Sequence, residues 1–275
     1  MKSGTIWVLS LWMTLAGAPA ATASEGGAPD ALPASPARLL EQAFDARYDV
    51  DLVQILSLEV RSRGKTVYRQ RLELASKRID GRLHALGRYR EPSELRGTAV
   101  LIIETGERSD DQFIYLPSMR RTRRISSAQR IDSFLGTDLS YEDLERPRVE
   151  DYALEFGPPQ SVEGEPVTTI VGRPRADPGY ERVEFLVANR DAAILETRHF
   201  KRSAATPFKI TRFPRADIRA ESGRLIPTRI LVESPGRGSQ TEARSEQLLV
   251  NPELESSLFT MAVLENARPI PGLER

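Results

Sequence analysis

The sequence predicts a mainly β protein of the α+β class, in which an antiparallel sheet or barrel is closed by an N-terminal and a C-terminal helix. Short segments of alternating apolar and polar residues follow one another, with turn residues every 8–12 positions or so. No strand–helix–strand rhythm of a parallel sheet interrupts them. Helical spacing of apolar residues occurs near the start and near the end of the chain.

The first 23 residues predict a cleavable signal peptide. Lys2 precedes an apolar run over residues 6–16, shorter than the roughly 20 residues that span a bilayer. Ala21-Thr22-Ala23 fits the small-x-small cleavage rule. Residues 24–35 then predict a disordered linker and residues 36–275 a single domain. Because the chain has no cysteine, a lipid anchor on cysteine is excluded, and we expect a periplasmic protein rather than one with a retained membrane anchor.

The expected elements follow in order along the mature chain. Ser35 and Pro36 predict the N-cap and first turn of a helix that runs to about Tyr48. The apolar period then changes from 3.6 to 2. The expected strands cover residues 56–61, 66–75, 83–89, 99–104, 112–116, 152–156, 167–171, 181–187, 193–200, 209–218, 225–232 and 242–250. Leu254, Leu258, Met261 and Leu264 predict a closing helix with Asn251 as its N-cap.

Residues 117–151 interrupt the expected strands. The first part of this segment is basic and the second part is acidic. Five arginines precede Asp132 without an intervening acid, and acids predominate from there to Asp151. The arginines are Arg120, Arg121, Arg123, Arg124 and Arg130. The first four are candidates for contact with lipid headgroup phosphates or an acidic partner surface, each adding up to about 1 kcal/mol near an anionic membrane. Alternatively, they pair with the acids of residues 138–151 within the fold. Ser140 with Asp143 predicts a weak capping box.

Composition and motifs do not favour an enzyme. The 39 basic and 39 acidic residues balance, so a nucleic-acid partner is not expected and any electrostatic function is local. His84 and His199 lie in different expected strands without metal-ligand spacing. Neither a Gly-x-Ser-x-Gly elbow nor a phosphate-binding loop occurs. We therefore expect no catalytic residues, no metal and no cofactor.

Three stretches resemble the LolA-type outer-membrane lipoprotein-sorting proteins of the bacterial periplasm. The stretches are residues 96–101 with 115–118, residues 134–144 (FLGTDLSYEDL), and residues 225–230 with 250–251, 258–260 and 264–265. The resemblance implies an incomplete barrel of antiparallel strands, with helices as a lid over an apolar cavity for acyl chains. Members of this branch are often associated with RND/MMPL-type membrane exporters, so such an exporter is an implied partner. The family brings no catalytic residues.

The leading hypothesis is a periplasmic carrier or accessory protein that shields a lipid or lipoprotein acyl chain. The expected cavity residues are Leu56, Leu58, Val60, Val100, Ile102, Phe113, Tyr115, Phe259 and Leu264. Since strand side chains alternate, an error of one residue would place a strand's whole set on the other face. The second hypothesis is a non-carrier adaptor of an RND-type exporter with a filled core, and the third is a periplasmic hydrolase.

Overall fold

The computed structural model describes residues 35–106, 110–176, 178–266 and 270–273. The expected signal peptide, and the expected linker except for Ser35, lie outside the described residues. Within the described part of the chain, no helix is long and apolar enough to cross a membrane.

Helix α1 (Pro36–Tyr48) begins where the sequence predicts it. The Ser35 hydroxyl accepts a hydrogen bond from the backbone N–H of Arg38 at 3.2 Å, and Pro36 occupies the first turn. Its buried face consists of Leu39, Leu40, Ala43 and Phe44. These side chains pack on β9, β10 and β11, where the Phe44 and Phe185 rings meet edge to face with centroids 5.6 Å apart.

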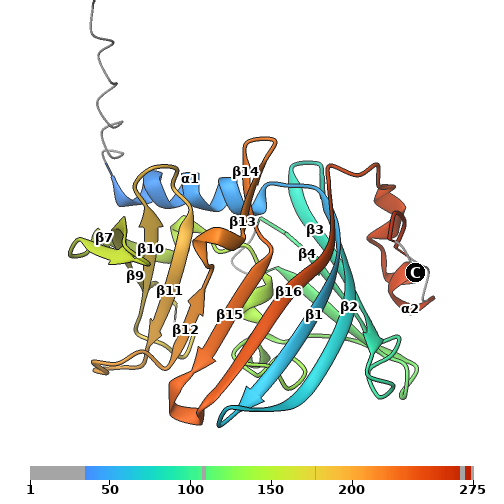
Figure 1. The fold of residues 1–275 in the computed structure, drawn as a ribbon. Coiled ribbons are helices and arrows are strands. Elements are labelled where there is room, and N and C mark those ends of the chain that lie inside the picture. The colour runs from blue at the N-terminus through green and yellow to red at the C-terminus, as the bar shows by residue number, and fades with distance from the viewer. Residues whose placement is uncertain (1–34, 107–109, 177, 267–269, 274–275) are drawn as a thin grey trace, which may run out of the picture. The chain divides into compact units, whose positions relative to one another are not determined.

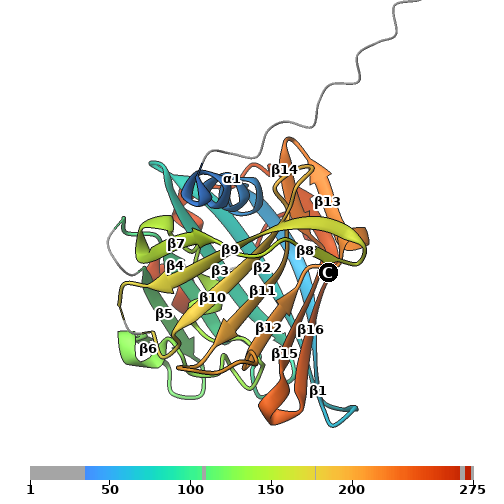
Figure 2. The same cartoon turned by 90° about the vertical axis from the view of Figure 1, so that its left-hand side faces the viewer.

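One large sheet contains most of the strands, and all of its pairings are antiparallel (Figures 1 and 2). The strands are β1 (Leu52–Ser62), β2 (Lys65–Ile79), β3 (Arg82–Glu91), β4 (Ala99–Ile103), β5 (Asp111–Leu116), β6 (Arg121–Arg124), β7 (Tyr152–Phe156), β8 (Gln160–Val162), β9 (Glu165–Pro174), β10 (Arg182–Ala188), β11 (Ile194–Phe200), β12 (Lys209–Arg212), β15 (Arg229–Ser234) and β16 (Ser239–Val250). Their order is β6-β5-β4-β3-β2-β1-β16-β15-β12-β11-β10-β9-β7, with β8 also paired to β9. Strands β13 (Ile218–Glu221) and β14 (Arg224–Pro227) form a separate hairpin.

The large sheet is curved but not closed, because β6 and β7 stand at its two ends without pairing to each other. This confirms the predicted fold class. The remaining elements are short 3-10 turns, η1 (Ser127–Gln129), η2 (Glu142–Leu144), η3 (Val149–Asp151), η4 (Arg215–Asp217), η5 (Pro235–Arg237) and η6 (Ser256–Leu258), and helix α2 (Met261–Glu265).

The structure corrects four details of the predicted elements. The expected strand 225–232 is divided between β14 and β15, which belong to different sheets. The closing helix is a 3-10 turn followed by the five-residue α2, and Asn251 has φ 52° instead of capping a helix. Leu254, Leu258 and Leu264 are nevertheless buried. The apolar spacing therefore predicted correctly which residues are buried, but not that they form one continuous helix. The expected strand 209–218 ends at Arg212, because Phe213 and Pro214 lead into η4. Part of the arginine run forms the edge strand β6, where charged side chains suit an unpaired edge.

Each face of the large sheet is covered by a different part of the chain. We call the face that packs on α1 and on residues 125–144 the inner face. The outer face of β1–β5 carries a row in register across five strands, Val53, Ala75, Leu86, Leu101 and Phe113. Residues 254–266 and 270–273, the C-terminal segment, pack on this row. Figure 1 shows α2 outside the sheet beside β3 and β4.

Candidate functional site

The inner face of β1–β5 is apolar and is covered by residues 125–144, which we call the inner segment. The sheet contributes Leu58, Leu72, Tyr89, Val100 and Ile114, all buried. Ile125, Phe134 and Tyr141 of the inner segment fill the space above them. The Phe134 ring packs between Tyr89, at 6.2 Å between centroids, and Tyr141, at 5.3 Å. The inner segment therefore occupies the place where the sequence predicted an acyl cavity.

The structure divides the nine predicted cavity residues between the two faces of the sheet. Leu56, Leu58, Val100 and Ile102 belong to the inner cluster, and Val60 is buried on the same side of β1. Phe113, Tyr115, Phe259 and Leu264 belong to the outer cluster under the C-terminal segment.

The division on β5 follows from the strand register. Val100 lies opposite Ile114, and Leu101 lies opposite Phe113. The sequence prediction took the aromatic alternates of β5, whereas its inner positions are Gln112 and Ile114. Ile114 was missed for this reason, whereas Leu72 and Tyr89 lie on β2 and β3, from which the prediction took no residue. Only pairing with β4 reveals which alternates face inward.

Asp138 is the first anchor of the inner segment. One carboxylate oxygen accepts hydrogen bonds from Arg237 at 2.6 Å and the Ser239 hydroxyl at 2.5 Å. The other accepts from the Thr241 hydroxyl at 2.9 Å, and the Asp138 backbone N–H donates to that same hydroxyl oxygen at 2.8 Å. Burial raises the pKa of Asp138, but the hydroxyl and Arg237 hydrogen bonds outweigh it and hold the pKa below its usual value.

The second anchor is a buried ion pair. The Lys209 ammonium lies 2.7 and 2.8 Å from the two carboxylate oxygens of Asp143. The Ser140 hydroxyl and backbone N–H both donate to Asp143. Tyr141 is the N-cap of η2 and no side chain caps this turn, so Ser140 and Asp143 are in contact but do not form the predicted capping box. His199 is buried next to this pair, and burial, reinforced by Lys209, lowers its pKa to about 3.

The arrangement of Lys209, Ser140 and Asp143 is relevant to the third hypothesis, that of a periplasmic hydrolase. Lys209 lies 3.3 Å from the Ser140 hydroxyl oxygen, a distance at which a neutral lysine would act as a general base. The same nitrogen is held by both carboxylate oxygens of Asp143, and an ammonium in such an ion pair has no lone pair to accept a serine proton. The pair ties the inner segment to β12.

Arg130 of the inner segment pairs with Glu145, the residue that follows the segment. Their side chains form an ion pair at 2.7 Å, and the Glu142 backbone N–H donates to the Arg130 carbonyl at 2.9 Å. Gln112 of β5 donates to the Tyr141 carbonyl at 3.0 Å. Burial raises the pKa of Glu145 to about 7, and the nearby Asp110 carboxylate adds to the effect while Arg130 opposes it.

We expect Glu145→Gln to remove a pH dependence of stability. Because the pKa is raised from 4.5 to about 7 on folding, the folded protein binds more protons than the unfolded chain between these values. Folding stability therefore falls as pH rises through this window, by about 3 kcal/mol at most, since one pKa unit corresponds to about 1.4 kcal/mol. Urea unfolding from pH 4.5 to 8 measures it. A stability difference between the two proteins that does not change with pH would contradict the assignment.

The four arginines of the predicted contact site project into solvent. Arg120, Arg121, Arg123 and Arg124 are all exposed. Arg124 pairs with Asp111 of β5. Among the acids of residues 138–151, Asp138, Asp143 and Glu145 pair with Arg237, Lys209 and Arg130.

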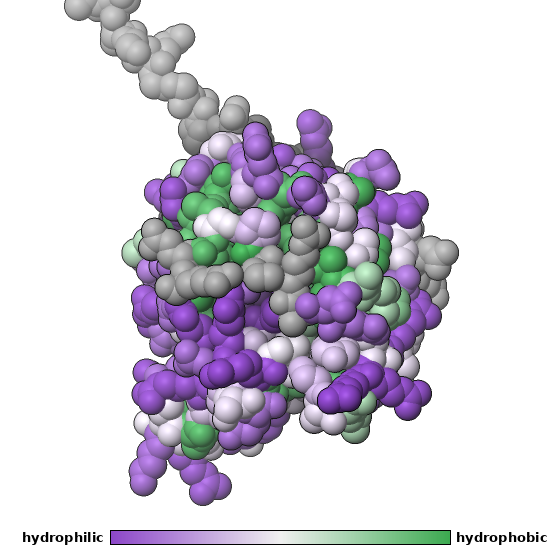
Figure 3. Space-filling model, turned by 90° about the vertical axis from the view of Figure 1, so that its right-hand side faces the viewer, coloured by the Kyte–Doolittle hydropathy of each residue, from purple (hydrophilic) through white to green (hydrophobic). Residues whose placement is uncertain are grey.

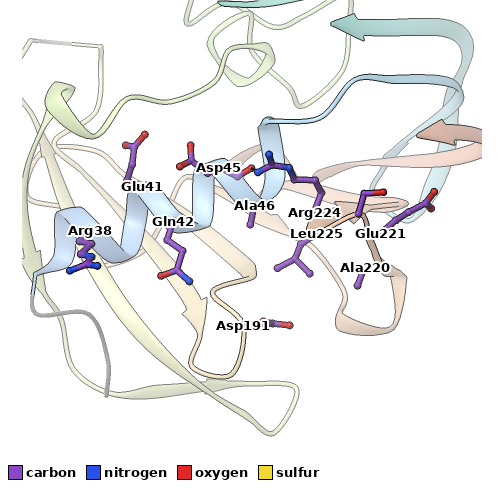
Figure 4. A pocket seen from close by; sticks show the side chains of 12 residues that line it. Arg38, Glu41, Gln42, Asp45, Ala46, Asp191, Ala220, Glu221, Arg224 and Leu225 are labelled. Atoms are coloured by element: carbon purple, nitrogen blue, oxygen red, sulfur yellow. Dashed lines mark hydrogen bonds between the residues drawn. The ribbon is translucent and has the colours of Figure 1, made fainter. Parts of the chain in front are cut away.

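Two pockets at the surface of the described residues have charged walls. The larger, of 770 Å³, lies between α1 and the β13–β14 hairpin (Figure 4). Glu41 and Asp45 line it from α1, and both pair with Arg146. The smaller, of 420 Å³, lies over a ladder of paired arginines and glutamates on β10–β12. Neither pocket resembles an apolar acyl site.

The fold is that of the LolA-like lipoprotein-sorting proteins, as three solved structures show. A putative outer membrane lipoprotein-sorting protein domain from Vibrio parahaemolyticus superposes with a TM-score of 0.76 at 20% identity, covering 83% of this chain and 97% of that chain. A DUF1329 family protein from Desulfovibrio piger gives 0.74 at 23% identity, covering 83% and 95%. A LolA superfamily protein from Nitrosomonas europaea gives 0.63 at 18% identity, covering 82% and 97%.

A family model also matches this chain, over residues 81–266, and carries the description "-like: Uncharacterized protein". Because the match spans more than half of the sequence, the chain belongs to this family. No curated protein matches the chain. The resemblance to LolA-type proteins that the sequence motifs indicate is thus confirmed at the level of the fold.

Proposed function

We propose that this protein is a periplasmic carrier that shields a lipid or lipoprotein acyl chain on the inner face of β1–β5. The observation that carries the proposal is that the inner segment, residues 125–144, covers that face. Its apolar side chains pack against an irregular segment and not against a second sheet or a long helix. An acyl chain that replaces this cover keeps the face dry and gains about 0.8 kcal/mol per buried CH₂ group.

The inner segment is suited to movement because its internal structure is sparse. Apart from η1 and η2, it contains a single β-bridge, between Ser133 and Ser140. Side-chain anchors at Asp138 and Asp143 attach it to the sheet, together with hydrogen bonds from Gln70 to the Leu135 carbonyl and from Gln112 to the Tyr141 carbonyl. Displacement of the segment as a unit therefore leaves the strand pairing of the large sheet intact.

The route of the cargo follows from the sequence expectations. The signal peptide would direct the chain to the periplasm. An RND/MMPL-type exporter is the proposed donor of the lipid. Arg120, Arg121, Arg123 and Arg124 are the proposed contacts for headgroup phosphates or for an acidic partner surface, which their exposure supports.

Neighbouring positions on β4 provide a test of the inner face. Ile102 contributes to the inner cluster and Ile103 to the outer one, and both are partly buried. We expect Ile102→Asp to reduce uptake of a fluorescent fatty acid at least tenfold, whereas Ile103→Asp, the matched control, retains it. Circular dichroism and thermal unfolding establish that both variants fold. Equal uptake by Ile102→Asp and the wild-type protein would contradict the site.

The filled inner face equally favours a second function, that of a non-carrier adaptor of an exporter. Organic extraction of protein purified without detergent, followed by mass spectrometry, distinguishes the two. A stoichiometric lipid supports the carrier. Protein that is consistently empty and also fails to take up a fluorescent fatty acid supports the adaptor.

A further inference from the structure

Six connections of the large sheet gather at one end of the molecule. In an antiparallel sheet, every second connection lies at the same end. The connections at residues 63–64, 92–98, 117–120, 201–208 and 235–238 follow this rule, and so do the described residues between β9 and β10, 175–176 and 178–181. Figures 1 and 2 show them at the lower end of the sheet, away from α1. We call this group of connections, with the strand residues next to them, the basic end.

Exposed cations from four separate connections meet at the basic end. They are Arg63, Lys65, Arg96, Arg120, Arg121 and Arg202. None of the six forms an ion pair with a carboxylate of the described residues. Glu91 and Glu94 are exposed acids at the same end. The chain is neutral as a whole, so this excess of positive charge is a local property that the fold creates from distant segments.

Apolar side chains stand among these cations. Met119, in the turn between β5 and β6, is 68% exposed, and Val67, next to the β1–β2 turn, is 60% exposed. In Figure 3 small hydrophobic spots lie within the hydrophilic lower end of the molecule. Basic side chains that surround exposed apolar ones are typical of surfaces that enter the interface of an anionic bilayer. An acidic protein surface would match the cations but would leave Met119 and Val67 without a partner.

We propose that the basic end is a docking surface for a membrane that contains anionic lipids. The purpose of docking, delivery or collection of the acyl chain, rests on the proposed function, but the docking itself does not. In the docked orientation the Arg237–Asp138 anchor faces the bilayer, because Arg237 lies in the β15–β16 turn of the same end. The inner segment is thus held at the end from which a lipid would arrive.

Vesicle flotation tests the proposal with the whole protein. One variant replaces Arg63, Lys65, Arg96 and Arg202 by Gln, which leaves the hairpin of Arg120 and Arg121 unchanged. The matched control replaces four cations at the other end, Arg38, Arg82, Arg190 and Arg219, by Gln. Vesicles of phosphatidylcholine, with or without about one third phosphatidylglycerol, serve as the probe.

We expect the wild-type protein and the control to bind the anionic vesicles only, and the basic-end variant to bind them about tenfold more weakly. Added salt should weaken the binding, because screened charges drive it. Equal binding by the basic-end variant, or equal losses in the control, overturns the proposal. Fatty-acid uptake measured in solution is the separate readout of the carrier function. If the protein binds vesicles but takes up no fatty acid, the carrier function is contradicted and the docking surface is supported. If it takes up fatty acid but does not bind vesicles, the docking surface is contradicted and the carrier function is supported.

Discussion

A disulfide between residues 138 and 241 is expected to abolish acyl uptake, and its reduction is expected to restore it. In the native protein the Asp138 backbone N–H lies 2.8 Å from the Thr241 hydroxyl oxygen, so the two residues are in direct contact. The double substitution Asp138→Cys and Thr241→Cys ties the inner segment to β16. Because the chain has no other cysteine, no competing disulfide forms.

The reduced double variant has lost the hydrogen bonds of the first anchor. Arg237, Ser239 and Thr241 all donate to the Asp138 carboxylate, so its removal weakens the hold on the inner segment. We therefore expect uptake of a fluorescent fatty acid to be faster than in the wild-type protein under reducing conditions. Under oxidising conditions the same protein should take it up at least tenfold more slowly than when reduced.

A second cysteine pair controls for the chemistry of oxidation. Ser57 and Arg244 are directly opposite in β1 and β16, and their disulfide would join two strands that are already paired. We expect no change in uptake on oxidation of Ser57→Cys/Arg244→Cys. If the oxidised 138–241 protein takes up fatty acid as fast as the reduced one, the inner segment is not the cover of the site.

The elements predicted correctly are those whose signals are local. Ser35 and Pro36 define the start of α1 because an N-cap and a first turn involve only neighbouring residues. The strand Tyr152–Phe156 was predicted with its observed bounds from its alternation. By contrast, the edge strand β6 consists of arginines and threonine, and only its pairing with β5 makes it a strand. Sequence patterning contains no signal for that pairing.

The candidate site was only partly predictable because its contacts join distant residues. The motif of residues 134–144 was singled out, but its partners Arg237 and Lys209 are 99 and 66 residues away from Asp138 and Asp143. Sequence periodicity gave no specific sign that Phe134 and Tyr141 are buried, because both lie in a loop without regular alternation. Their burial depends on the curvature of the sheet, which brings the inner face around them.

The second large effect is expected from Lys209→Met. This substitution leaves the Asp143 carboxylate buried without its cation, and the loss of one partner of a buried pair costs about 3–5 kcal/mol of folding stability. Met keeps the aliphatic length of the lysine, so the effect reports the charge. Urea unfolding at neutral pH measures it, with Arg244→Met as the control. Arg244 is half exposed and pairs with Glu242 at the surface, so its loss should cost at most about 1 kcal/mol.

The double variant Lys209→Met/Asp143→Leu separates the ion pair from packing. With both charges absent, no buried charge is left uncompensated, and we expect most of the lost stability to return. The stability of Lys209→Met alone should also rise as pH falls toward values at which the isolated Asp143 is protonated, because protonation removes the uncompensated charge. If the single and double variants are equally destabilised, and neither responds to pH, then Lys209 stabilises the fold by packing, and the second anchor of the inner segment is not electrostatic.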